Sequence, residues 1–236
     1  MFKSIGRVRV LGEESLDPDV DLSGDEGLVA LLDTIDGTDL LIRGFGNWCS
    51  AAIFFENGRI LASFVALYRE GVYFATENKV GVFREADRRL ESLPLRGLGD
   101  PVPLSEATIC AYGQKFSSFA RLARRSGLVS ALESAGQTRG RGRFYTLAGN
   151  PMSVRLVDAP VPVHAVFDAE GQMPHDVAPG AHIAVRAGAT LLDLDGQPID
   201  LGQALLHPGD PEHRMRYVLA NTEELARELV EVLRSS

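Results

Sequence analysis

The sequence predicts a layered α/β (α+β) fold in two parts, and two patterns support this. Residues 1–105 contain successive apolar runs typical of strands, with turn pairs such as Asn57-Gly58 and Glu70-Gly71 between them that favour hairpins. Residues 106–236 alternate strand-like runs with segments whose apolar residues recur at helical spacing. We therefore expect a largely antiparallel N-terminal sheet followed by a second α/β half.

Individual elements follow from the same patterns. The first half should contain strands near residues 8–11, 29–32, 48–55, 60–67 and 72–76. Residues 87–103 are rich in Pro, Gly and Arg, which is typical of a linker. In the second half we expect a strand from residue 107, a helix around 116–123, a helix from about 174 to 187 and a strand at 190–194. A closing helix should begin at Thr222, because Asn221-Thr222-Glu223-Glu224 has the form of a capped helix start.

Composition restricts the classes of partner and the compartment. The formal net charge of −8 argues against nucleic acid or an anionic membrane as a partner. The sequence shows neither a signal peptide nor an apolar stretch long enough to span a membrane. Cys49 and Cys110 lie in apolar strand-like stretches, which suggests buried free thiols in a reducing compartment such as the cytoplasm.

The segment 31–40 carries the strongest chemical signal. An apolar strand ends at Asp33, and Asp36, Gly37 and Thr38 follow within five residues. A sharp turn at Gly37 would let the two carboxylates converge, and hard oxygen ligands suit Mg²⁺, Mn²⁺ or Ca²⁺. Taken alone, such a turn is more often a solvated loop with a helix cap. The metal-site interpretation therefore depends on further ligands elsewhere in the chain.

Two other segments offer such ligands. Gly12-Glu13-Glu14 follows a short apolar alternation, and Asp176 lies at the start of an apolar helical stretch, within Pro174-His175-Asp176-Val177-Ala178-Pro179-Gly180. Glu13 and Asp176 could complete the metal site, whereas Glu14 is more simply explained as a solvated charge at the end of a strand.

Together these segments resemble the inositol monophosphatase-like phosphatases, which are Mg²⁺-dependent and related to fructose-1,6-bisphosphatases. The family signatures are G-E-E at a strand end, D-P-[IL]-D-G-T at a turn and W-D-x-A-[AG]-G at a helix start. They correspond here to Gly12-Glu13-Glu14, Asp33-Thr34-Ile35-Asp36-Gly37-Thr38 and His175-Asp176-Val177-Ala178-Pro179-Gly180. The resemblance extends from about residue 8 to about residue 220 and implies the family's sugar phosphatase-like fold.

The resemblance also implies roles for individual residues. Glu13, Asp33 and the carbonyl of Ile35 would hold one metal, and Asp33, Asp36 and Asp176 a second; two or three Mg²⁺ ions are expected, with Mn²⁺ as a substitute. The Gly37 and Thr38 amides would hold the phosphate, and the Thr38 hydroxyl would orient the attacking water. Thr38, Asp36 and Glu13 are thus the expected catalytic residues. Asp168 resembles the family's acidic residue that binds sugar or cyclitol hydroxyls, and His175 would contact substrate or lie at the rim of the site.

The implied activity is Mg²⁺-dependent hydrolysis of a phosphate monoester on a small sugar, cyclitol or nucleoside, and a homodimer is expected. Three departures keep an alternative open. His175 replaces the family's Trp before Asp176. The chain begins almost at the G-E-E strand, without the usual preceding helices, so no residue is assigned as the acidic partner of Thr38. Gly149-Asn150-Pro151-Met152-Ser153 replaces the family's Gly-Ser/Thr-Ala-Ala. The alternative is a repurposed or catalytically impaired member that binds a phosphorylated ligand or partner without hydrolysing it.

Overall fold

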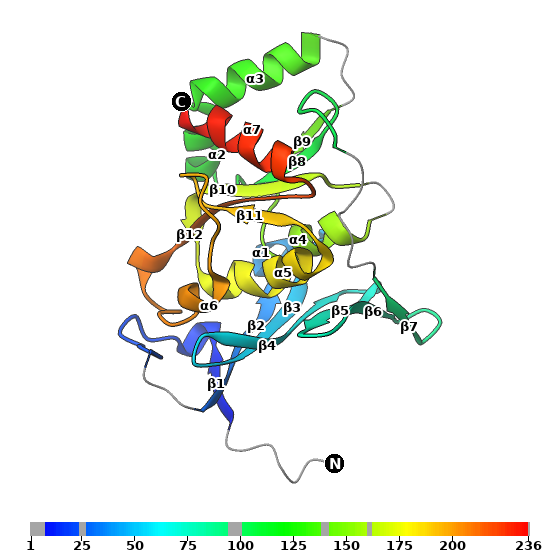
Figure 1. Ribbon diagram of the computed structural model, residues 1–236, viewed down its shortest axis with the longest axis vertical. Coiled ribbons are helices and arrows are strands. Elements are labelled where there is room, and N and C mark those ends of the chain that lie inside the picture. Colours follow the sequence, from blue (N-terminus) through cyan, green and yellow to red (C-terminus); the bar gives the residue numbers. More distant parts are fainter. Residues whose placement is uncertain (1–7, 24–26, 94–100, 138–141, 160–161, 236) are drawn as a thin grey trace.

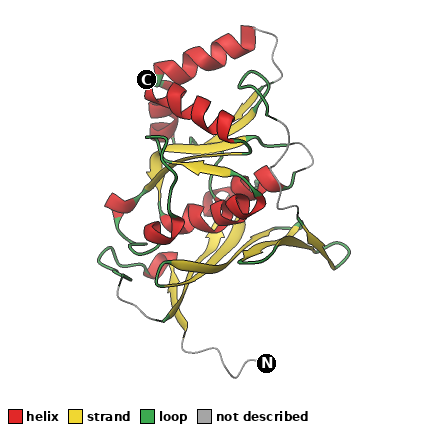
Figure 2. Cartoon of the chain, viewed as in Figure 1, coloured by secondary structure: helices red, strands yellow, loops and turns green. Residues whose placement is uncertain are grey.

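The computed structural model describes residues 8–23, 27–93, 101–137, 142–159 and 162–235, and arranges them as two sheets with helices between and above them (Figures 1 and 2). Sheet A has seven strands in chain order: β1 (Val8–Gly12), β2 (Leu28–Asp36), β3 (Cys49–Glu56), β4 (Arg59–Leu67), β5 (Gly71–Thr76), β6 (Val80–Arg84) and β7 (Arg89–Ser92). Sheet B has the order β11-β12-β10-β8-β9, formed by β8 (Thr108–Ala111), β9 (Arg143–Tyr145), β10 (Ala165–Gln172), β11 (Thr190–Leu192) and β12 (Met215–Ala220).

Sheet A confirms the predicted antiparallel organisation. Every neighbouring pair in it is antiparallel except β1 and β2, which run parallel. The hairpin turn between β3 and β4 places Asn57 at φ 51° and Gly58 at φ 73°. These left-handed conformations are the ones that a tight two-residue hairpin requires. The linker prediction for 87–103 was wrong at its start, because β7 lies there and pairs with β6.

Helices fill the space between the sheets and cover the far side of sheet B. The helices are α1 (Thr38–Ile42), α2 (Phe116–Ala123), α3 (Ser126–Gln137), α4 (Asn150–Val157), α5 (Pro174–Ala187), α6 (Leu201–Ala204) and α7 (Glu223–Arg234), with short 3₁₀ turns η1 (Glu13–Ser15) and η2 (Pro211–His213). Helix α5 contacts strands of both sheets and packs beside α4, whereas α2, α3 and α7 lie on the other side of sheet B (Figure 1). The buried α5 therefore forms the central layer of the molecule. No helix within the described ranges is both long and apolar enough to cross a membrane.

Helix α5 contains a proline that is compensated from outside. Pro179 has no N–H to donate to the carbonyl of His175, one turn earlier. The side chain of Asn150, at the start of α4, supplies the missing donor: its Nδ2 lies 2.8 Å from His175 O. Its Oδ1 accepts the Gly180 N–H at 2.8 Å. The fully buried Asn150 thus fixes the first turn of α5 against α4.

The two faces of sheet A differ. The inner face packs on α4 and α5 through buried residues such as Val65, Tyr73 and Val82. On the outer face, Phe54 and Phe64 meet edge to face with ring centroids 5.9 Å apart, and Phe64 and Phe74 stack at 6.4 Å. No helix in the described part of the chain covers this outer face (Figure 2).

Candidate functional site

The two aspartates of the 31–40 segment face the same way because β2 is irregular. In a regular strand, residues three apart point to opposite faces. Here the register with β3 shifts between Asp33, which pairs with Ala51, and Asp36, which pairs with Cys49. This bulge places three residues of β2 opposite two of β3 and turns both carboxylates toward the inside.

Gly37 ends the strand in a conformation that other residues rarely adopt. Its φ is 90°, and a Cβ at this position would lie 3.2 Å from Trp48 Cβ. Helix α1 begins at the next residue, Thr38, whose Oγ1 donates to Ile35 O at 2.9 Å. The Ile35 N–H in turn donates to Asp33 Oδ1 at 3.0 Å. The turn that follows Asp33 is therefore held by its own side chains.

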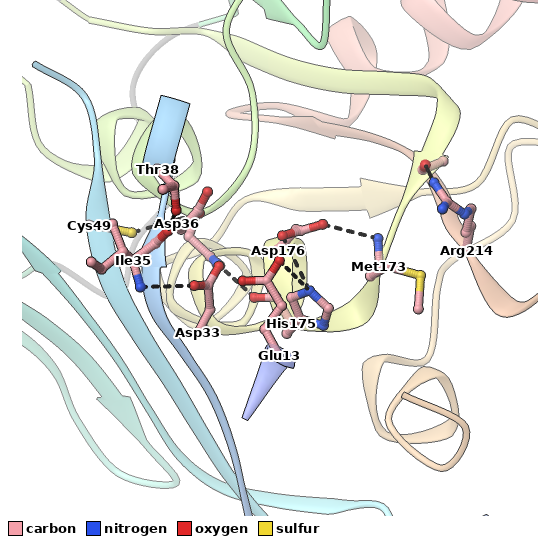
Figure 3. A network of polar contacts seen from close by, with 12 residues as sticks. Glu13, Asp33, Ile35, Asp36, Thr38, Cys49, Met173, His175, Asp176 and Arg214 are labelled. Carbon is pink, nitrogen blue, oxygen red and sulfur yellow. Dashed lines mark hydrogen bonds and ion pairs between the residues drawn. The ribbon is translucent and has the colours of Figure 1, made fainter. Parts of the chain in front are cut away.

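Glu13 and Asp176 reach the same point from other elements. Glu13 lies in η1, directly after β1, and Asp176 lies in the first turn of α5, where its Oδ2 accepts the Met173 N–H at 3.3 Å. Ligand atoms of Asp33, Asp36 and Asp176 all lie within 4.8 Å of one another, and so do those of Glu13, His175 and Asp176 (Figure 3). The structure thus brings together all four acidic residues predicted to bind metal.

These carboxylates resist ionisation in the absence of a cation. Burial, together with the charges of Asp36, Glu13 and Asp176, raises the pKa of Asp33 to about 8. Burial and the charge of Asp176 raise the pKa of Asp36 to about 7, although hydrogen bonds from Asn150 oppose the increase. Burial raises the pKa of Asp176 to about 6. A divalent cation would remove this penalty, because it offers each carboxylate an opposite charge at close range.

The donor set fits a hard divalent ion. The four carboxylates supply oxygen only, which suits Mg²⁺ and Mn²⁺. The carbonyl of Ile35 accepts one hydrogen bond from Thr38, and a carbonyl oxygen has a second lone pair. Glu13, Asp33, Ile35, Asp36 and Asp176 all line one cavity of about 400 Å³.

Several residues that support this cluster were not anticipated. Gly149, with φ 84°, brings the backbone close to two ligands: a Cβ there would lie 3.2 Å from Asp176 O and 3.5 Å from Asp36 Oδ2. Cys49 Sγ donates to Asp36 Oδ2 at 3.7 Å. Asn150 fixes the turn that carries Asp176. Its signal in the sequence was Pro179, since a proline inside a helix leaves one carbonyl in need of a donor from elsewhere.

The cavity also has a cationic side. Lys115, Arg214 and Gln114 line it together with Gly37, Thr38 and His175. Arg214 donates to Gly171 O at 3.2 Å, and neither Lys115 nor Arg214 forms an ion pair with a carboxylate of the described residues. Both cations oppose the rise in the pKa of Asp176. Figure 3 shows Arg214 beyond Met173, on the opposite side of Asp176 from Asp33. The cavity therefore offers positive charge beside the acidic cluster.

The remaining predicted residues differ in position. His175 lines the cavity and is 5% exposed. Asp168 is buried and does not line the cavity; its Oδ1 accepts the Glu170 and Gly171 N–H groups at 2.6 and 3.0 Å. These hydrogen bonds hold the irregular part of β10 between Asp168 and Gln172. Gln172, at the end of this segment, does line the cavity. Glu14 is exposed, as expected of a solvated charge.

The chain matches the model of the inositol monophosphatase family over residues 2–235. No curated protein sequence matches it significantly.

Solved structures of the same fold are similar over nearly the whole chain. SaIMPase-II with bound 2′AMP is 20% identical with a TM-score of 0.69, covering 95% of this chain and 74% of its own. An IMPase/NADP phosphatase complexed with Mg²⁺ and phosphate is 19% identical with a TM-score of 0.66, covering 97% and 74%. SuhB of Mycobacterium tuberculosis is 20% identical with a TM-score of 0.67, covering 96% and 76%. At these identities the likeness establishes the fold.

Proposed function

The chain belongs to the inositol monophosphatase family, and from that premise we propose that it hydrolyses the phosphate monoester of a small sugar, cyclitol or nucleoside. Membership makes it a metal-dependent phosphoric monoester hydrolase. The observation that carries the proposal is the convergence of Glu13, Asp33, Asp36 and Asp176 in one cavity that Lys115 and Arg214 also line.

We assign the ligands as the sequence motifs imply. Glu13, Asp33 and the Ile35 carbonyl would hold one Mg²⁺, and Asp33, Asp36 and Asp176 a second, with room for a third and with Mn²⁺ as a substitute. When bound, such ions supply charge neutralisation for the transferring phosphoryl group and lower the pKa of water. The neighbouring structure of an IMPase/NADP phosphatase complexed with Mg²⁺ and phosphate supports Mg²⁺ as the ion.

The protein's own groups would position the reactants. The Thr38 Oγ1 proton is directed at Ile35 O, so its lone pairs are free to accept a hydrogen bond from a water molecule. The Gly37 and Thr38 amides, at the cavity wall, would hold phosphate oxygens. The water held by Thr38 would attack phosphorus as the ester P–O bond breaks. The leaving oxygen takes up a proton from this water, and the products are inorganic phosphate and an alcohol.

The cationic side would attract and orient the substrate. Lys115 and Arg214 face an anion arriving at the cavity, and Asn47 adds a buried Nδ2 that has no hydrogen-bond partner among the described residues. A cavity of about 400 Å³ suits a small phosphate ester rather than a macromolecule. A neighbouring structure with 2′AMP bound supports including nucleoside phosphates in the substrate class.

The direct test is release of phosphate from inositol 1-phosphate, fructose 1,6-bisphosphate and adenosine 2′-monophosphate, with Mg²⁺ and with chelator. We expect Mg²⁺-dependent turnover of at least one compound, lost in Asp33→Asn. Tight binding of Mg²⁺ and substrate by calorimetry without turnover of any compound would replace this proposal with the alternative of a non-hydrolysing binding protein.

We further propose that two copies associate through the outer face of sheet A. At the outer positions of β3–β6 the only charges are Glu56 and its register partner Arg59, both at one end, although the whole chain carries −8. Phe64 and Phe83 on this face are 36% and 41% exposed. Four strands and their margins span roughly 500 Å², which approaches the ~800 Å² per partner of a stable interface. A face whose only charges are one opposite pair at its end matches a second copy of itself without net repulsion.

Sedimentation equilibrium tests this association. The full chain should be a dimer, and Phe64→Glu should shift it to a monomer. Phe116→Glu serves as the control, because Phe116 is 96% exposed but lies on α2, in the layer beyond sheet B. A monomeric wild-type chain, or a Phe64→Glu dimer, would contradict the proposal.

We propose a reducing compartment, the cytoplasm, as the location. In support, Cys49 and Cys110 are buried and unpaired, and thiols of this kind persist where disulfides are not formed.

A further inference from the structure

His175 differs from the other enclosed histidines in what surrounds it. His182 Nδ1 lies 2.8 Å from Ser63 Oγ, and His164 Nδ1 accepts the Thr108 N–H at 2.9 Å. Each of these rings has a short hydrogen bond that explains its position. His175 is 5% exposed, less than His182 and the half-buried His164, yet its Nδ1 has no partner among the described residues. Nδ1 therefore does not account for the position of the ring, and its other nitrogen, Nε2, is the atom that faces polar groups.

The polar neighbours of His175 are two members of the acidic cluster. Its Nε2 lies 3.5 Å from Asp176 Oδ1 and 3.9 Å from Glu13 Oε1, distances that are long for hydrogen bonds (Figure 3). Ligands held about 2.1 Å from one ion lie about 3 Å apart at right angles and about 4 Å apart on opposite sides. The observed separations fall in this range. Both contacts of Nε2 thus have the spacing of two ligands on one ion, and ligand atoms of all three residues lie within 4.8 Å of one another.

A nitrogen ligand changes which ion is preferred. Mg²⁺ binds oxygen ligands almost exclusively, whereas imidazole suits first-row transition metals. Asp33, Asp36 and Asp176 form an all-oxygen set, while Glu13, His175 and Asp176 form a mixed set that shares only Asp176 with it. The two positions thus differ in chemistry although they lie side by side.

We propose that Glu13, His175 and Asp176 form a mixed nitrogen–oxygen position that binds a first-row transition-metal dication, such as Mn²⁺, in preference to Mg²⁺. The inference rests on the proposed function insofar as both require a metal centre at this cluster. His175 then acts as a metal ligand and not as a substrate contact.

Pulsed electron paramagnetic resonance on the Mn²⁺-loaded protein tests this directly, because a bound imidazole nitrogen gives a ¹⁴N coupling. The wild-type protein should show this coupling, and His175→Phe should lack it. By calorimetry, His175→Phe should weaken Mn²⁺ binding at this position about 10-fold or more, with Mg²⁺ binding nearly unchanged. His213→Asn is the matched control, since exposed His213 lies against His207 and could bind Mn²⁺ adventitiously.

The outcomes separate the two proposals. Mn²⁺ bound without ¹⁴N coupling in the wild-type protein overturns this inference and leaves the all-oxygen phosphatase site standing. Coupling that survives His175→Phe but disappears in His213→Asn also overturns it. Absence of any Mg²⁺ or Mn²⁺ binding removes the proposed function as well. If His175→Phe does not fold, as judged by circular dichroism, the spectrum of His213→Asn decides: coupling that persists there supports the proposal, and its loss overturns it.

Discussion

Replacing Asp36 with Asn should make the metal-free protein more stable while abolishing its phosphatase activity. The carboxylate of Asp36 is crowded by Asp176 and removed from water, so its pKa is about 7. At pH 7.5 most folded molecules therefore carry an ionised group that the fold disfavours. The isosteric amide fills the same space without the charge, but it cannot bind a cation in the same way.

The magnitude follows from the pKa of Asp36. A pKa of about 7, compared with 3.8 for a free Asp, corresponds to about 4 kcal/mol, because each tenfold change in an ionisation constant is worth about 1.4 kcal/mol. The amide also loses charge-assisted contacts from Asn150 and Cys49, so we expect a net gain of about 2 kcal/mol. For a chain of 236 residues this raises Tm by about 4–8 °C.

Thermal unfolding at pH 7.5 with chelator measures the stability, and Mg²⁺-dependent phosphate release measures the activity. Asp19→Asn is the matched control: it removes the same charge from an exposed position and should leave both readouts unchanged. An Asp36→Asn protein that melts at or below the wild-type temperature would refute the argument from repulsion. Preserved turnover in it would refute the role of Asp36 in the reaction.

Three further predictions concern pH, packing and substrate capture. Because Asp33, Asp36 and Asp176 have raised pKa values, the metal-free fold binds more protons than the unfolded chain, and the stability gained from these protons is lost as pH rises from about 4 to 8. The Tm increase caused by Mg²⁺ should therefore be larger at pH 8 than at pH 5.5. An equal increase at the two pH values would contradict the reasoning. Asn150→Ala removes the hydrogen bonds of Asn150 to two buried backbone groups and should lower the free energy of unfolding in urea by about 2–4 kcal/mol. A loss below about 0.5 kcal/mol would count against this role of Asn150. Arg214→Met should raise KM several-fold with kcat nearly constant, and the increase in KM should be smaller at high salt. The control Lys79→Met, outside the cavity lining, should leave KM unchanged. If Arg214→Met has the wild-type KM at low salt, Arg214 does not contribute to substrate capture.

The hairpins of sheet A could be predicted because their turns are encoded locally. Asn57 and Gly58 adopt positive φ values, which Asn tolerates better than most residues and Gly accepts because it lacks a Cβ. Strand β7 could not, since Arg89–Ser92 is short, polar and at an edge, and it is ordered by its pairing with β6. The residues of β7 alone do not indicate that β6 will pair with them.

The same distinction applies to the site. The carboxylates were predictable because the bulge in β2 and the turn at Gly37 bring Asp33 and Asp36 together within a few residues. Lys115 and Arg214 were not, because they reach the cavity from loops of sheet B whose placement depends on tertiary packing. For Asp168, the substrate contact that the resemblance implies stays a prediction, while the structure shows its Oδ1 accepting the N–H groups of Glu170 and Gly171.

The distribution of the ligands over the chain has a consequence for folding kinetics. Asp33 belongs to sheet A and Asp176 to the central helix α5, so the complete cluster exists only after these layers have docked. An ion that binds only to the complete cluster cannot stabilise the folding transition state if the layers dock after it. The ion must, however, dissociate before sheet A and α5 can separate during unfolding. Mg²⁺ should therefore slow unfolding much more than it accelerates refolding. The unfolding rate, compared with and without chelator, then records how long sheet A and α5 remain in contact.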